Sequence, residues 1–190
     1  MAPGSSVPEK TAPGPLELVQ RFVNSVHLET GEDELAGPDE LRAWLAEREL
    51  IGPDQPVGKA DLDRVIDVRE GLRALLLANN GQRLDEERVA RLDRAAERAG
   101  VRVVFRQGAD PRLAPEAEGV DGAIGRLLAI VVGAVEQGHW ERLKACPRDV
   151  CQWAFYDRSK NHSGRWCLME VCGNIEKARA FRDRKRRLRP

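Results

Sequence analysis

The segment LKACPRDVCQWAFYDRSKNHSGRWCLMEVCGNIEK, residues 143–177, contains all four cysteines of this 190-residue chain. They are spaced Cys146-x4-Cys151-x15-Cys167-x4-Cys172, as two pairs separated by a loop. In a reducing compartment, paired cysteines at such intervals are more often zinc ligands than disulfides. Four thiolates leave zinc no open position for water, so the spacing predicts one structural Zn²⁺. Four ordinary buried thiols and a redox switch are the alternatives.

The residues between and after the cysteines predict a small module around this metal. Residues 152–157 suit a strand, 158–164 a loop, and 165–167 a returning strand. A helix then opens at Cys172-Gly173-Asn174 and supplies the last ligand from its first turn, which is a treble-clef-like arrangement. A module this small needs a metal to hold it together. Its predicted core is Trp140, Trp153, Phe155 and Trp166.

Positive charge is concentrated at the same end of the chain. The formal net charge is zero, but residues 140–190 contain 14 Lys or Arg against 6 Asp or Glu. Such an end favours a polyanionic partner, because binding phosphates releases counterions. The alternative is a solvated terminal charge run. The candidate nucleic-acid contacts are Arg158, Lys160 and Arg165 in the loop, and Lys177, Arg179, Arg182, Arg184, Lys185 and Arg186 in the helix.

The upstream chain predicts a helical domain. Residues 1–14 hold three prolines and few apolar side chains, so we expect a flexible tail there. Apolar residues at helical spacing predict helices over 16 to about 31, 38–52, 61–79, 85–100 and 120 to about 144, the last being the most apolar and central to the core. Alternation at Val101, Val103 and Phe105 predicts a half-buried strand that pairs with 112–114.

The predicted fold is therefore mainly α with a small β-hairpin. A helical domain over residues 15–142 is followed by a small treble-clef-like zinc finger with a basic C-terminal helix over 143–190, and we expect the two to be rigidly joined. The segment around residue 1 lacks the apolar core of an export signal, and no apolar stretch reaches the roughly 18 residues of a membrane span. We expect a cytoplasmic protein with no membrane partner.

The helical domain shows no catalytic constellation. It has no Ser/His/Asp set, no phosphate-binding loop and no cluster of metal-binding carboxylates, so we expect no enzyme. If the protein senses a small-molecule effector, the predicted pocket lies among the first three helices and is lined by Asn24, Trp44 and Arg69. Whether the protein forms a homodimer stays open at this point.

Motifs in both halves resemble known families. The C-terminal part of the chain resembles the CGNR-type zinc finger. The matching residues are Leu143-Lys-Ala-Cys146, both Cys-x4-Cys pairs, Trp153, Phe155-Tyr-Asp157, Ser159-Lys-Asn161, Arg165-Trp-Cys167 and Met169-x-x-Cys172-Gly-Asn-x-x-Lys177. The upstream part of the chain resembles the ABATE domain, which commonly precedes that finger. The matching residues are Phe22-Val-Asn-Ser25, Leu41-x-x-Trp44-Leu45 and Arg69-x-x-Leu72-Arg73-x-Leu75-Leu76. The resemblance covers residues 16–187 and implies a bacterial, stress-induced transcription regulator. One departure is Ile175, which stands where the family has its name-giving arginine.

Three hypotheses follow for the function. The first is a zinc-dependent regulator that binds double-stranded DNA through the last helix, with a helical domain that senses an effector. The second is a zinc-stabilised adaptor that docks an acidic protein partner. The third is an RNA-binding protein that stacks bases on its Trp and Tyr side chains.

Overall fold

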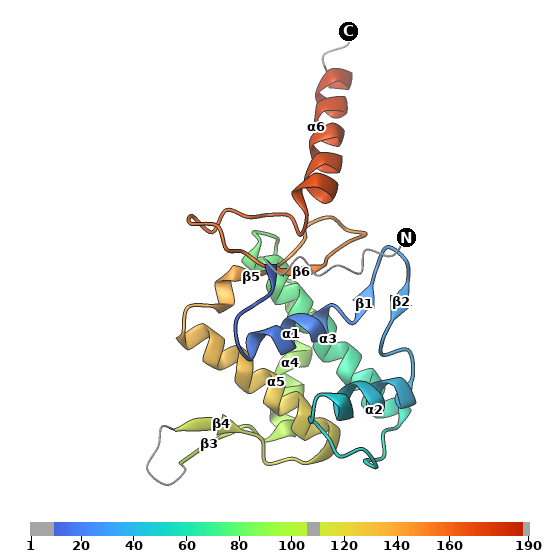
Figure 1. Cartoon of the computed structure of the whole chain (residues 1–190), viewed down its shortest axis with the longest axis vertical. Coiled ribbons are helices and arrows are strands. Elements are labelled where there is room, and N and C mark those ends of the chain that lie inside the picture. Colours follow the sequence, from blue (N-terminus) through green and yellow to red (C-terminus); the bar gives the residue numbers. More distant parts are fainter. Residues whose placement is uncertain (1–9, 106–110, 188–190) are drawn as a thin grey trace.

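The computed structural model describes residues 10–105 and 111–187, and it confirms the mainly α fold class. A helical body carries a zinc-finger module at one end, and the last helix projects from that module away from the body (Figure 1). The helices are α1 (Leu16–Val23), α2 (Pro38–Glu47), α3 (Lys59–Asn79), α4 (Glu86–Ala99), α5 (Gly119–Glu136) and α6 (Asn174–Arg187). Short helical turns lie at η2 (Trp140–Arg142) and η3 (Met169–Gly173).

Three separate antiparallel strand pairs complete the fold. They are β1 (Val26–His27) with β2 (Glu32–Asp33), β3 (Arg102–Val104) with β4 (Arg112–Ala114), and β5 (Leu143–Ala145) with β6 (Ala154–Tyr156). The β3–β4 hairpin lies at the opposite end of the molecule from α6 (Figure 1). Among the described residues, no helix combines the length and apolar character needed to cross a membrane.

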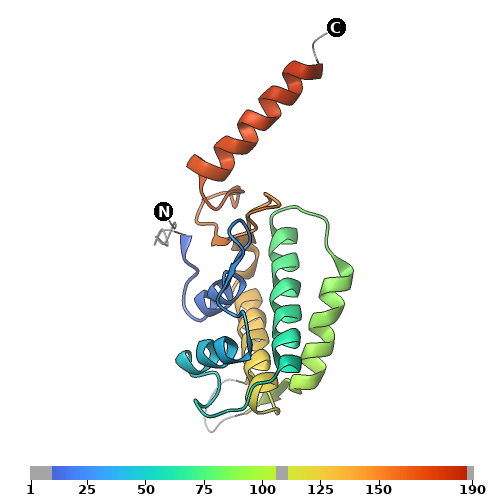
Figure 2. The same ribbon diagram turned by 90° about the vertical axis from the view of Figure 1, so that its right-hand side faces the viewer.

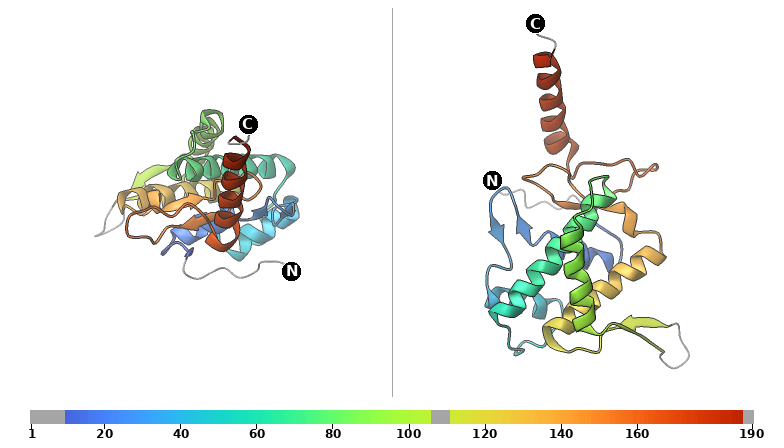
Figure 3. Two further views of the ribbon diagram at one scale, coloured as in Figure 1. Left: turned by 90° about the horizontal axis from the view of Figure 1, so that it is seen from above. Right: turned by 180° about the vertical axis from the view of Figure 1, so that it is seen from behind.

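Helix α3 is the centre of the body and contacts α1, α2, α4, α5 and β5. Its apolar stripe, including Leu72 and Leu76, is fully buried against side chains such as Phe22 of α1 and Leu127 of α5. Seen from behind, α4 lies over α3 and α5 (Figure 3). Close approach at this crossing requires glycine: a Cβ at Gly71 of α3 would lie 2.7 Å from Cγ of Leu92 in α4, and a Cβ at Gly125 of α5 would lie 3.0 Å from Cβ of Ala99.

Two helices are shorter than their apolar spacing predicts. The first ends at Val23 rather than near residue 31, because the Asn24 side chain bonds to Ala154 of β6 and the chain then turns into β1. Helix α5 ends at Glu136 rather than near residue 144, because Gly138 adopts a positive φ of 69° and residues 143–145 pair as β5. The predicted central position of α5 holds only for its first half, since Val132 and Val135 are exposed.

The β3–β4 hairpin forms at the predicted residues, but the strand side chains predicted to be buried are mostly exposed. Val103 and Phe105 are 53% and 80% exposed, whereas Val104 and Leu113 are partly buried. The physical reason is that this hairpin packs on α5 mainly through β4, which leaves much of β3 exposed. The expectation that Val103 and Phe105 face the core is therefore wrong.

The finger and the body share one hydrophobic core. Leu143 and Ala145 of β5 and Ala154 and Tyr156 of β6 are buried in the same cluster as the leucines of α3. Strand β6 pairs with β5, so the predicted returning strand at residues 165–167 is wrong. Trp140 packs against the main core and not inside the finger, because η2 turns it toward the body.

Side chains in or just after α1 and α3 also donate hydrogen bonds to backbone carbonyls of the finger and of the η2 turn that leads into it. The donors and their carbonyl acceptors are Arg73 to Gln152 (3.0 Å), Asn79 to Trp140 and Leu143 (3.0 Å each), Asn80 to Ala145 and Arg165 (2.8 Å each), and Gln20 and Asn24 to Ala154 (3.1 and 2.9 Å). Each bond joins segments at least 61 residues apart in the chain. These bonds fix the finger's orientation on the body.

The predicted flexible tail over residues 1–14 is ordered in its last part. Residues 1–9 lie outside the described residues. From residue 10 onward, Lys10 Nζ donates to the carbonyl oxygen of Trp166 (2.7 Å), and the amide of buried Ala12 donates to Gln20 Oε1 (2.7 Å). These contacts give the segment a place against the finger, which its composition does not reveal.

The fully buried Arg73 provides a test of this junction. Its guanidinium donates to the carbonyl oxygens of Val23 (2.6 Å) and Gln152 and pairs with Glu70. Arg73→Met removes these bonds while keeping most of the apolar stem. We expect a loss of about 3 kcal/mol in the free energy of unfolding, because the carbonyl oxygen of buried Val23 is left without its donor. Urea titration followed by circular dichroism measures it. Arg94→Met, at an exposed site on α4, should change stability by less than about 0.5 kcal/mol.

Candidate metal centre and basic helix

The four cysteines converge at the base of α6. Their Sγ atoms all lie within 4.8 Å of one another, and Cys146, Cys167 and Cys172 are buried while Cys151 is partly exposed. The Sγ of Cys167 lies 3.6 Å from those of Cys151 and Cys172. A disulfide requires a separation of about 2.05 Å, so these are four free thiols.

The spacing of the sulfurs fits one tetrahedral zinc ion. Zn–S bonds of about 2.3 Å place the corners of a tetrahedron about 3.8 Å apart, close to the separations observed. The crowded thiols also perturb one another. Hydrogen bonds from Cys151 and Cys167 lower the pKa of Cys146 to about 2, the hydrogen bond to Cys146 raises the pKa of Cys151 to about 12, and hydrogen bonds with Cys146 and Cys151 raise the pKa of Cys167. Four thiolates this close together therefore need a cation among them. The donor set fits zinc.

The ligands come from two parts of the chain that zinc would join. Cys146 follows β5 and Cys151 lies in the loop that leads to β6. Cys167 precedes η3, and Cys172 lies within η3, which leads directly into α6. When bound, a zinc ion with four thiolate ligands supplies a structural cross-link and has no position left for substrate. The cross-link attaches the base of α6 to the β5–β6 hairpin.

A small apolar cluster surrounds the cysteines. Phe155 is buried among them, and Trp153, Trp166 and Leu168 pack against the cluster. Three of the four predicted core residues of the finger are thus confirmed, with Trp140 the exception. Lys10 Nζ lies 5.0 Å from the centre of the Phe155 ring, so the N-terminal segment closes one side of the cluster.

A buried ion pair, which the sequence pattern did not predict, joins Lys144 and Asp157. Lys144 Nζ donates to Asp157 Oδ2 (2.8 Å) and to the carbonyl oxygen of His162 (2.6 Å), and both charged side chains are at most 6% exposed. Asp157 also accepts the amides of Ser159 and Gly164. Burial alone would raise the pKa of Asp157, but the hydrogen bonds from Lys144 and Ser159 lower it to about 2. The pair shapes the loop that carries Arg158 and Lys160.

This depressed pKa makes a pH-dependent prediction. A carboxylate with a lowered pKa stabilises the fold above its ordinary pKa near 4, and that contribution disappears as the pH falls toward 2. Asp157→Asn should therefore lower the free energy of unfolding by about 2 kcal/mol at pH 7, and the difference from the unmodified protein should shrink between about pH 4 and pH 2. Denaturant titrations across that range measure it. A difference independent of pH would contradict the assignment, and Asp149→Asn, at an exposed site, serves as the control.

The basic residues form two groups around the metal centre. Arg158, Lys160 and Arg165 are exposed on the finger, where Arg158 lies over the Tyr156 ring (5.5 Å) and donates to the carbonyl oxygen of Thr11. The second group runs along α6, which stands clear of the body in both side views (Figures 1 and 2). Its members, all exposed, are Lys177, Arg179, Arg182, Arg184, Lys185 and Arg186. Glu176 lies 3.9 Å from Arg179 and partly offsets it.

The side chains predicted to line an effector pocket, Asn24, Trp44 and Arg69, are engaged by partners inside the body. Asn24 is occupied by its bonds to Ala154, and Trp44 Nε1 donates to Glu34 (2.9 Å) while its ring packs on Phe22. Arg69 forms two bonds to Asp33 (2.7 and 2.8 Å). All three are structural polar groups with partners inside the body. Within residues 10–105 and 111–187, two surface cavities, one beside α5 and one beside the start of α1, are lined by other residues.

Comparison with known families agrees with this architecture. A family model named ABATE and described as "Putative stress-induced transcription regulator" matches residues 16–137. The chain belongs to the ABATE family. The CGNR zinc finger model matches residues 142–185 of this ABATE protein, which confirms the resemblance and supports one structural zinc. Neither family description names a catalytic activity. No curated protein matches the chain.

The cysteine cluster predicts the metal content of the ABATE protein. Cys167→Ser removes the sulfur nearest to two of the others, so bound zinc should fall from about one ion per chain to far below that value. Elemental analysis of reduced protein after gel filtration measures it. Val150→Ser, an exposed change in the same loop, should leave the content unchanged. Unaltered zinc in Cys167→Ser would contradict the four-thiolate site.

Proposed function

We propose that this ABATE protein is a zinc-dependent transcription regulator that binds double-stranded DNA through α6. The observation that carries the proposal is a cationic helix that is exposed along its length and fixed at its base by the cysteine cluster. Isolated helices of this length are marginal in water, so the anchored first turn matters. A helix of 14 residues is about 21 Å long, and the DNA major groove accepts a single helix.

Two cationic faces on α6 support phosphate contacts on both sides of a groove. Arg179, Arg182 and Arg186 share one face by their three- and four-residue spacing, whereas Lys177 and Arg184, seven apart, share another. Arg158, Lys160 and Arg165 lie on the finger that carries the helix and extend the positive surface. Ile175, at the place of the family's arginine, is 40% exposed in the first turn. It offers an apolar contact instead of a cationic one.

In this proposal, residues 15–142 form a sensing domain and residues 143–190 the DNA-binding finger. Support for coupling between them comes from the shared core and the hydrogen bonds of Arg73, Asn79 and Asn80 to the finger backbone. An effector that shifts α3 or α1 would move the finger with them. Reduced thiols and a DNA partner are both found in the bacterial cytoplasm, which is where we place the protein.

The test is a fluorescence anisotropy titration of a pool of duplex DNA at several salt concentrations. Affinity should fall linearly with salt on logarithmic axes, because counterions are released. Arg182→Glu and Arg186→Glu should each weaken binding about tenfold or more and lower the salt slope by about one. Arg94→Glu on α4, an equal charge change away from the finger, should change binding little.

Two other results of this titration would favour the alternative hypotheses. Tighter binding to single strands than to duplex would favour the RNA-binding hypothesis. No DNA binding at about 50 mM salt would overturn the proposal and favour the adaptor, since non-specific electrostatic binding is strongest at low salt.

A further inference from the structure

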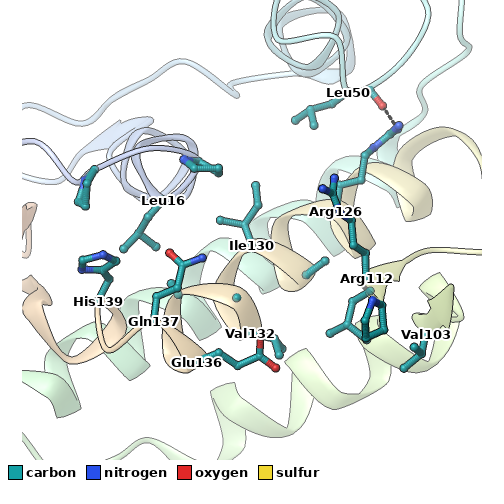
Figure 4. A pocket seen from close by; sticks show the side chains of 17 residues that line it. Leu16, Leu50, Val103, Arg112, Arg126, Ile130, Val132, Glu136, Gln137 and His139 are labelled. Carbon is teal, nitrogen blue, oxygen red and sulfur yellow. Dashed lines mark hydrogen bonds between the residues drawn. The ribbon is translucent and has the colours of Figure 1, made fainter. Parts of the chain in front are cut away.

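A groove beside α5 has no role in the function proposed above. It has a volume of about 720 Å³ and lies between α5, the segment leading into α1 and the β3–β4 hairpin. We call it the α5 groove. Figure 4 shows its apolar side chains, among them Leu16, Ile130, Val132 and Val103, with Arg112 and Arg126 toward one end and Gln137 and His139 toward the other. Its size falls within the range of small-molecule sites.

Gly133 is the feature that internal packing does not explain. In α5, a Cβ at Gly122 would lie 2.4 Å from the carbonyl oxygen of Ala117, and a Cβ at Gly125 would meet Pro115, so close packing requires both glycines. A Cβ at Gly133 would meet no atom within 4 Å, although glycine is among the least favourable residues inside a helix. Gly133 lines the groove. The missing side chain leaves room for something outside the chain.

The charges at one end of the groove indicate what that occupant is. Neither Arg112 nor Arg126 pairs with a carboxylate among the described residues, and Arg126 donates to the carbonyl oxygen of Leu50. The acidic residue in the lining is Glu136, which lies ten residues, about 15 Å along the helix, from Arg126. Guanidinium groups bind carboxylates by charge-assisted hydrogen bonds. An apolar groove with cations at one end is complementary to an amphipathic anion.

We propose that the α5 groove binds a small amphipathic carboxylate, with its apolar part along Ile130, Val132 and Gly133 and its acid group at Arg112 and Arg126. The far end of the groove is connected to the finger, because His139 Nδ1 hydrogen-bonds to the Tyr156 hydroxyl of β6 (2.8 Å). Binding there gives the body a way to influence the finger. That regulatory consequence rests on the proposed DNA function, whereas the binding site does not.

Isothermal titration calorimetry of the full, zinc-loaded protein with decanoate tests the site without DNA. Decanol is the uncharged counterpart. We expect saturable binding of decanoate, about tenfold tighter than that of decanol, from the charge-assisted bonds. Arg112→Gln should remove most of that tenfold preference and leave decanol binding unchanged. Arg94→Gln, the same change at an exposed site outside the groove, should leave both affinities as they are.

Two variants close the groove itself. Gly133→Trp fills the space beside α5, and Val132→Glu, at a 40% exposed position, places a negative charge there should the larger change prevent folding. Each should reduce decanoate affinity at least tenfold, while Ala90→Trp, on the exposed surface of α4, should not. Equal affinity in these variants, or no saturable binding at all, would overturn the site. A dimer that dissociates in Val132→Glu, without decanoate binding, would instead identify this face as an interface between copies.

Discussion

The convergence of four cysteine sulfurs at the base of α6 is the constraint on which the position of the basic helix depends. The sulfurs lie within 4.8 Å of one another, and the hydrogen bond to Cys146 raises the pKa of Cys151 to about 12. A divalent cation allows all four to ionise together and converts the four residues into a cross-link. Helix α6 packs against η3, the turn that carries Cys172. The position of the basic helix therefore follows from the metal.

The finger is an extension of the body as much as a module of its own. Its hairpin contributes Leu143 and Tyr156 to the core around α3, and buried Arg73 reaches from α3 to both α1 and the finger. The Lys144–Asp157 pair then fixes the loop above the hairpin. Small zinc modules are often connected to their neighbours by a linker. Here polar side chains and shared apolar packing replace the linker.

Local patterns predicted the elements whose signals are local, and failed where distant partners decide. The start and stop of α4 follow from Asp85, which caps the amide of Arg88, and from Gly100 at a φ of 57°. The early end of α1 depends on Asn24 bonding to Ala154, 130 residues away, while Val26 continues the helical spacing. The cysteine spacing predicted the metal centre, but not that β5 rather than residues 165–167 would pair with β6. Arg69 was predicted to line a pocket because its partner, Asp33, lies 36 residues away in the sequence and gives no local signal.

Amide hydrogen exchange, compared between zinc-loaded protein and protein stripped of zinc under reducing conditions, tests the metal's role most directly. The account predicts that protection is lost from residues 167–175, where the cysteines hold η3 and the first turn of α6, while α3, β5 and β6 keep theirs through the shared core. Unchanged protection of residues 167–175 after complete removal of zinc would contradict the claim that the four thiolates anchor the basic helix.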